Sequence, residues 1–207
     1  MIADVLPLSR WFFEGTRSPA LLQGGVRAAA NGGKMARVVV LTVVATLVVL
    51  GLAAYIGIRA GLMPANADAK PGRLETWVAK TSLRASLARE APRTPNPMPS
   101  TDANYAAGIK LYAQNCAVCH GTSAAEPTRI ARGLYQGPPQ LAKDGVEDDP
   151  DGIIYWKVAH GIRLTGMPAF DGTLKDEQIW QIVAFLKNMD ALPPAPQRLW
   201  KAVHIST

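Results

Sequence analysis

The sequence offers few residues for a metal cluster or a catalytic centre. Only two of its 207 residues are cysteine and three are histidine. A second cysteine pair is missing, so a closed zinc site would have to draw on His160 and His204. The sequence is also poor in strand-forming segments, unlike the βαβ setting of a thioredoxin-type C-x-x-C pair. No pair of catalytic carboxylates and no nucleophile beside a base is evident. These absences point away from zinc binding, dithiol chemistry and acid–base catalysis.

The two cysteines stand in one short motif, Cys116-Ala117-Val118-Cys119-His120. C-x-x-C-H is the attachment signature of a c-type haem. Each thiol can form a thioether with one vinyl group of the porphyrin, and the adjacent His120 can ligate the iron. The motif therefore predicts one covalently bound haem c.

Charge is divided unevenly along the chain. Residues 1–99 carry 12 Lys and Arg against 5 Asp and Glu, a balance of +7, whereas residues 100–207 carry 10 against 11, a balance of −1. A nucleic-acid-binding domain would carry its basic residues on its folded surface. The nearly neutral second half therefore argues against nucleic acid as a partner.

The basic residues of the first half flank an uncharged apolar run over residues 38–58. As a helix rising about 1.5 Å per residue, this run is long enough to cross the hydrocarbon core of a bilayer. We interpret it as a retained transmembrane anchor. The small residues Ala65, Ala67 and Ala69 leave a cleaved signal peptide as the alternative.

The segments around the anchor show no clear core pattern. Residues 1–37 are expected to be cytoplasmic and poorly ordered, and Met35 is a candidate alternative start. Within residues 59–99, the proline-free stretch 72–90 is rich in helix formers and predicts a helix whose basic face is either solvated or near the membrane surface. Four prolines between residues 92 and 99 then favour an extended connector that marks a domain boundary.

The pattern after the connector predicts an all-α domain over residues 100–193, with a C-terminal tail over 194–207. Asp102 can cap a helix over residues 103–115. A second helix is expected over 152–159, ending before Gly161. A third should start at Thr173 or Asp176 and bury an apolar stripe before Pro193 ends it.

Over residues 102–192 this domain resembles the class I monohaem cytochrome c family of compact bacterial type. Gly108, Tyr112 and Cys116 reproduce its Gly-x3-aromatic-x3-Cys spacing, and Ile182, Phe185 and Leu186 resemble positions of its last helix. The resemblance implies three main helices around one haem. It also implies a close helix crossing at Gly108 and a haem domain on the periplasmic side of the bacterial inner membrane.

The second axial ligand has several candidates. Met167 is favoured because it lies in Thr165-Gly166-Met167-Pro168, where glycine and proline enforce a loop. The family carries its methionine ligand in such a loop ahead of the last helix. The other residues with a suitable donor atom are Met98, Met189, His160 and His204.

Pro139 and Leu141 look like the family's Pro-x-Leu segment, whose proline carbonyl accepts the Nδ1 hydrogen of the axial histidine and whose leucine lines the ring. The stretch from Thr122 to Gln136 is longer than in small cytochromes, so Pro138 competes with Pro139 for this role. Tyr155, Trp156 and Arg163 carry groups that can partner haem propionates. Each of these three can equally be a core or surface residue.

With His120 and Met167 as axial ligands, no open iron position remains for a substrate. The predicted function is therefore single-electron transfer between redox protein partners by a membrane-anchored cytochrome rather than an enzyme. The alternative is the haem c subunit of a larger membrane oxidoreductase, such as a terminal oxidase or a quinoprotein dehydrogenase. A third interpretation is a gas sensor or weak peroxidase in which Met167 is labile.

Overall fold

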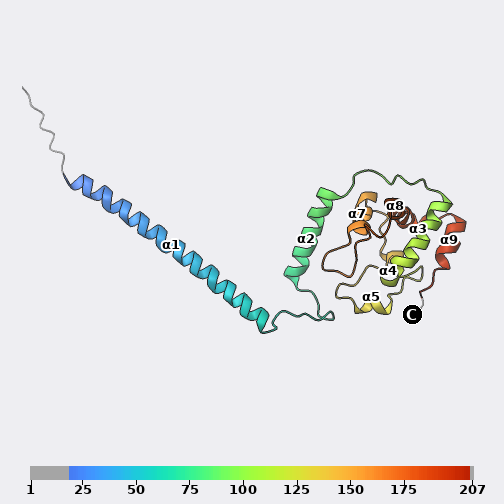
Figure 1. Ribbon diagram of the computed structural model, residues 1–207, viewed down its shortest axis with the longest axis horizontal. Helices are drawn as coiled ribbons and strands as arrows, with labels where there is room; N and C mark the ends of the chain where they lie inside the picture. The colour runs from blue at the N-terminus through green and yellow to red at the C-terminus, as the bar shows by residue number, and fades with distance from the viewer. Residues whose placement is uncertain (1–18, 206–207) are drawn as a thin grey trace, which may run out of the picture. The chain divides into compact units, whose positions relative to one another are not determined.

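A computed structural model describes residues 19–205 of the chain. Its contacts divide the chain into two units after Met63; among the described residues, the first unit contains one long helix and the second contains the other helices (Figure 1). Within residues 19–205 the fold is all-helical, and the only strand-like feature is an isolated bridge between Asp171 and Leu174. The predicted fold class is confirmed.

Helix α1 covers Pro19–Arg59. Residues 19–37 are therefore helical, although they were expected to be poorly ordered. Proline suits the first turn of a helix because its missing N–H has no intrahelical acceptor there. No further proline follows before Arg59, so the helix runs without a break. The segment Gly33–Arg59 is long and apolar enough to cross a membrane, and it contains the predicted span 38–58. Residues 1–18 lie outside the described part of the chain.

Helix α2 covers Arg73–Glu90, close to the predicted range 72–90. Its first turn is closed by Glu75, whose carboxylate accepts a hydrogen bond from the backbone N–H of Gly72 at 3.3 Å. The helix lies beside α7, Asp151–His160, in the second unit (Figure 1).

The proline-rich connector is packed onto the haem domain and is not a structural boundary. The backbone N–H of Asn96 donates to the Asp151 carboxylate at 2.8 Å, and its side-chain amide donates to the carbonyl of Trp180 at 2.9 Å. The Pro92 backbone lies directly against Gly152, where any side chain would collide with it. The proline residues keep the connector extended, and these contacts hold it against the haem domain.

The core of the second unit is the crossing of α3, Asp102–Asn115, with α8, Asp176–Lys187. Gly108 makes the approach possible, because a Cβ atom there would lie 2.8 Å from the carbonyl carbon of Gln181 and 2.9 Å from Cβ of Phe185. Thr101, rather than the predicted Asp102, caps α3 by accepting the N–H of Asn104. Asp102 is instead the first helical residue.

Helix α8 begins at Asp176, one of the two predicted starts, and its apolar stripe is buried as expected. The remaining elements are short; three lie in the loops between the main helices, and two follow α8. They are α4 (Ala117–His120), α5 (Arg129–Gly133), α6 (Leu141–Asp144), the 3-10 helix Met189–Ala191 and α9 (Pro194–Lys201).

The predicted C-terminal tail is corrected by α9, which packs on α3. Trp200 is 5% exposed, and its ring lies edge-on to Tyr112 and Phe185 at centroid distances of 5.4 and 5.0 Å. Pro193 does end the preceding segment, but Pro194 and Pro196 occupy the first turn of a new helix, where proline is tolerated. The folded domain therefore continues beyond residue 193.

Candidate haem-attachment site

The haem-attachment motif forms one helical turn directly after α3. Cys116 ends α3, and the N–H of His120 donates to its carbonyl at 2.9 Å. Positions i, i+3 and i+4 of a helix share one face, so Cys116, Cys119 and His120 are held on the same side. Both cysteines are half-buried free thiols. The turn thus keeps both thiols available for thioether formation beside the histidine.

Tyr112 holds this turn in place through its hydroxyl group. Its side chain is fully buried, and its hydroxyl donates to the carbonyl of Gly121 at 3.0 Å and lies 3.2 Å from that of His120. Gly121 has a φ of +77°, a conformation that glycine adopts without steric cost. The aromatic position of the family spacing thus connects α3 to the end of the haem motif.

The imidazole of His120 is oriented by Pro139. Nδ1 of His120 lies 2.9 Å from the carbonyl oxygen of Pro139 rather than of Pro138. A carbonyl can only accept, so Nδ1 carries the hydrogen and Nε2 keeps its lone pair. Burial lowers the pKa of His120, against the weaker opposing effect of the Pro139 carbonyl. Burial thus favours the neutral ring, and the hydrogen bond to Pro139 leaves Nε2 free to bind iron.

Burial also favours the protonated thiol of Cys116. It raises the pKa of Cys116 to about 12, and the neighbouring Cys119 acts in the same direction. A thiol with so high a pKa is protonated at neutral pH and is a poor nucleophile or metal ligand by itself. Cys116 therefore does not resemble the low-pKa cysteines of dithiol redox enzymes.

Gln140 belongs to the site, although it is not among the residues predicted from the sequence. Its side-chain amide nitrogen lies 3.2 Å from the carbonyl oxygens of both Cys119 and Pro138. The residue is 8% exposed, and its Oε1 is buried without a hydrogen-bond partner. Gln140 thus connects the attachment turn to the segment that orients His120. In the sequence, the only sign of this role is that Gln140 lies between the predicted site residues Pro139 and Leu141.

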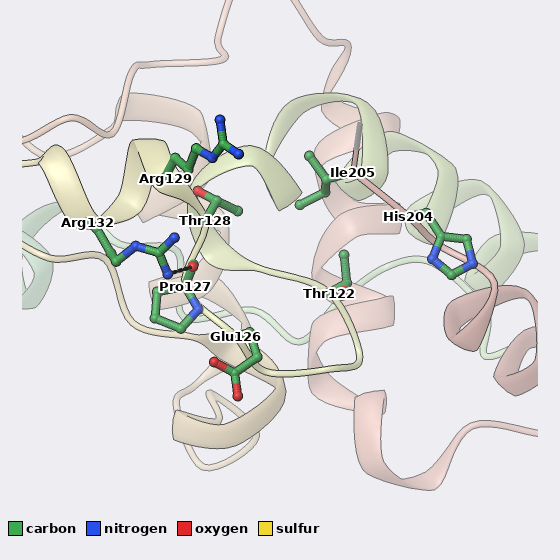
Figure 2. A pocket seen from close by; sticks show the side chains of 8 residues that line it. All are labelled: Thr122, Glu126, Pro127, Thr128, Arg129, Arg132, His204 and Ile205. Atoms are coloured by element: carbon green, nitrogen blue, oxygen red, sulfur yellow. Dashed lines mark hydrogen bonds between the residues drawn. The ribbon is translucent and has the colours of Figure 1, made fainter. Parts of the chain in front are cut away.

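The long stretch between the motif and Pro139 folds back onto the motif. Thr128 caps α5 by accepting the N–H of Ala131 at 3.0 Å, and its hydroxyl donates to the carbonyl of Val118 at 2.5 Å. A shallow pocket lies between this stretch and the C-terminal segment (Figure 2). His204 lines this pocket, and Arg132 there donates to the Pro127 carbonyl at 2.8 Å. None of the nine predicted site residues lines the pocket.

Met167 lies in an ordered loop after α7. Its carbonyl accepts the N–H of Ile162 at 3.2 Å, and its own N–H donates to the hydroxyl of Thr165 at 3.1 Å. The half-buried side chain packs against the same apolar cluster as Cys116 and Leu141. The structure therefore brings the predicted ligand loop, one attachment cysteine and the predicted ring-lining leucine to one core.

Tyr155, one of the predicted propionate partners, is already engaged elsewhere. Tyr155 donates its single hydroxyl hydrogen to the Asp176 carboxylate at 2.9 Å and stacks on Trp180 at 4.3 Å. Trp156 lies against His160, with ring centroids 5.1 Å apart, and its indole contributes after Arg89 to lowering the pKa of Glu90. The hydroxyl hydrogen of Tyr155 is thus used on a protein carboxylate, which argues against its assignment to a haem propionate. The assignment of Trp156 remains a prediction.

Arg163 differs from them because it is exposed, and the structure records no ion pair for it among residues 19–205. It lies four residues before Met167 in the same loop. Its assignment to a haem propionate remains a prediction.

Comparison with known proteins places these features in one family. Residues 103–186 match the family model described as cytochrome c oxidase, cbb3-type, subunit III. The chain is 33% identical to cytochrome c6 of Parathermosynechococcus lividus over 93 residues, which cover 43% of this chain and 94% of that protein. Cytochrome c6 of a Picosynechococcus species is 35% identical over 44% of this chain and 77% of its own length.

A larger protein also contains a similar segment. The quinohemoprotein alcohol dehydrogenase ADH IIB of Pseudomonas putida is 30% identical over 98 residues. The match covers 47% of this chain but only 13% of that enzyme. The similarity is therefore confined to a single haem-domain-sized region of the larger protein.

Proposed function

The chain belongs to the class I c-type cytochromes, and from this premise we propose that it is a membrane-anchored carrier of single electrons. The observation that carries the proposal is the attachment turn, in which Cys116, Cys119 and His120 share one face while Pro139 orients the imidazole. Bound haem c supplies an iron that accepts and releases one electron.

Each residue of the site has a role in this proposal. Cys116 and Cys119 would hold the porphyrin covalently. His120 would bind the iron through Nε2, because Nδ1 is committed to the Pro139 carbonyl. Met167 would bind from the opposite side, and a thioether sulfur facing an imidazole raises the reduction potential. Leu141 would pack against the ring.

Occupation of both axial positions favours a carrier over a sensor or peroxidase. Carbon monoxide binding to the reduced full-length chain tests this directly. A firmly six-coordinate iron should bind carbon monoxide poorly, whereas rapid and complete binding at low concentration would contradict the carrier function.

We place the haem domain on the periplasmic side of the inner membrane, with Gly33–Arg59 as the retained anchor. This proposal is tested by adding protease to spheroplasts that express the chain. The haem domain should be degraded in intact spheroplasts, and a haem domain that is protected until lysis would contradict the orientation.

A second candidate is a haem c subunit of a larger membrane oxidoreductase. It is favoured by the match to a family described as an oxidase subunit and by the similar segment in a quinohemoprotein dehydrogenase. A stable assembly that survives solubilisation in mild detergent would support this candidate. A chain that migrates alone would support the independent carrier.

A further inference from the structure

Helix α2 packs on the haem domain with only one of its faces. Thr76, Leu83 and Leu87 are half-buried and recur at the spacing of a single helical stripe. On a neighbouring face, both carboxylate oxygens of Glu75 lie 2.8 Å from the hydroxyl of Tyr135. These contacts fix how α2 is rotated about its own axis, and they leave the opposite side of the helix uncovered.

The opposite side, which we call the outer face, contains no charged residue. Leu74, Trp77 and Val78 are 73%, 64% and 51% exposed and follow the i, i+3, i+4 spacing of neighbours on one helix face. Three smaller exposed residues continue the stripe, namely Thr81, Ala85 and Ala88. An exposed group of large apolar side chains on a soluble domain marks an interaction surface.

The residues around the outer face identify its partner as a lipid surface. Arg73, Lys80 and Arg84 are exposed along one border of this face. Tryptophan and leucine on one face with basic residues beside it are the composition typical of a helix in the interface of an anionic membrane. The one nearby acid, Glu75, already accepts from its own helix end and from Tyr135.

The chain also keeps this face close to a bilayer. Only residues 60–72 separate the end of α1 at Arg59 from the start of α2 at Arg73. Thirteen residues span at most about 45 Å when fully extended. The three large apolar residues lie in the first two turns of α2, at the end nearer in sequence to the predicted anchor. A free protein partner would explain neither this short tether nor the placement of the apolar side chains.

We propose that α2 lies along the outer surface of the membrane, with its outer face inserted among the headgroups of anionic lipids. This inference rests on the proposed retention of α1 as an anchor. Because α2 is packed on α7, its docking fixes which side of the haem domain faces the bilayer. The remaining sides are then presented to redox partners.

Site-directed spin labelling of the full haem-loaded chain tests the proposal. Thioether formation consumes Cys116 and Cys119, so a nitroxide reacts only with an introduced cysteine. Val78→Cys reports on the outer face, and Lys110→Cys on the exposed surface of α3 is the matched control. The chain is placed in vesicles of phosphatidylcholine and phosphatidylglycerol with the haem reduced. The accessibility of each label to oxygen and to a polar nickel chelate is then measured.

We expect the ratio of oxygen to nickel accessibility at residue 78 to be several-fold higher than at residue 110. The ratio should fall when phosphatidylglycerol is replaced by phosphatidylcholine, because the basic border then loses its partner. Equal ratios at the two positions would overturn the proposal. The proposal would also be overturned if, in detergent without lipid, the label at residue 78 were shielded equally from oxygen and from the nickel chelate. Protein rather than lipid would then cover the outer face of α2.

A third label separates this inference from the proposed anchoring. Val44→Cys lies within the candidate membrane span. If this label is lipid-exposed while residue 78 remains aqueous, the docking of α2 is wrong and the anchor stands. If the label at residue 44 is aqueous, the proposed anchor itself fails.

Discussion

The Nδ1 atom of His120 lies 2.9 Å from the carbonyl oxygen of Pro139, a residue 19 positions further along the chain. This bond connects the attachment turn to the loop that precedes α6. It also determines which nitrogen of the ring can bind iron. The orientation and the tautomer of the axial histidine therefore depend on a segment outside the C-x-x-C-H motif. Changes in that segment should therefore alter the haem without touching its ligands.

Gln140→Leu should perturb the haem through this segment. The substitution removes the amide hydrogen bonds to Cys119 and Pro138, at a cost of about 1 kcal/mol in the free energy of unfolding. If the His120–Pro139 bond weakens as a result, the less basic imidazole should raise the reduction potential. Potentiometric titration and thermal unfolding measure both effects. The matched control is Gln114→Leu at an exposed position of α3, and equal effects of the two substitutions would contradict the role of Gln140.

Gly108→Ala should destabilise the crossing of α3 and α8. The added methyl group would meet the Gln181 backbone and Cβ of Phe185, so the helices must separate, at a cost of about 1–3 kcal/mol. The loss of stability is measured by thermal unfolding, monitored by circular dichroism. Gly133→Ala in α5 is the control, because a Cβ atom there would meet no atom within 4 Å. Unchanged stability of the Gly108 variant would show that the crossing is looser than the structure indicates.

Trp200→Ala should cost about 3–5 kcal/mol in the free energy of unfolding, as expected for removing a large aromatic side chain from a core. The ring fills the space beside Tyr112 and Phe185. Denaturant unfolding compares this variant with Leu199→Ala, whose side chain is 42% exposed on the same helix. A loss no larger than that of the control would mean that α9 does not belong to the folded domain.

Tyr155 should give the stability a dependence on alkaline pH. Burial, followed by the carboxylates of Asp176 and Asp171, raises the pKa of this phenol to about 12 in the folded state. An unfolded phenol titrates near pH 10, so the stabilisation is complete below about pH 10 and is lost as the pH rises to about 12.

The measurement is the melting temperature across this pH range. Tyr155→Phe should show a smaller loss of stability than the unsubstituted chain between about pH 10 and pH 12. Asp176→Asn should lower the pKa of Tyr155, because the charge that opposes ionisation is gone. Identical pH profiles for the Tyr155→Phe variant and the unsubstituted chain would contradict the assigned shift.

The structural features that could be predicted from the sequence are those that short local patterns determine. The attachment turn and the helix beginning at Asp176 each depend on residues a few positions apart, whereas the close crossing at Gly108 was implied by the resemblance to the cytochrome c family. A motif of this kind specifies its own local structure because helical geometry fixes which residues share a face. The apolar run that forms much of α1 was likewise readable from composition alone.

The sequence could not predict contacts that depend on the complete fold. Tyr155 is a suitable propionate partner by chemistry, but its neighbours in space are Asp176 and Trp180. The burial of Trp200 was also hidden, because its partners lie on α3 and α8. Nothing in the local sequence of Gln140 indicates that its amide reaches the carbonyl of Cys119.

The central claim is that Met167 and His120 hold the iron between them, and the absorption spectrum of the oxidised full-length chain tests it most directly. Methionine bound to ferric haem gives a weak charge-transfer band at the red end of the spectrum. We predict this band in the unsubstituted chain and in Met189→Ala, whose methionine is a 5% exposed core residue. It should be absent from Met167→Ala. A band that persists in Met167→Ala, or a pigment that acidic organic solvent extracts from the unsubstituted chain, would contradict the account.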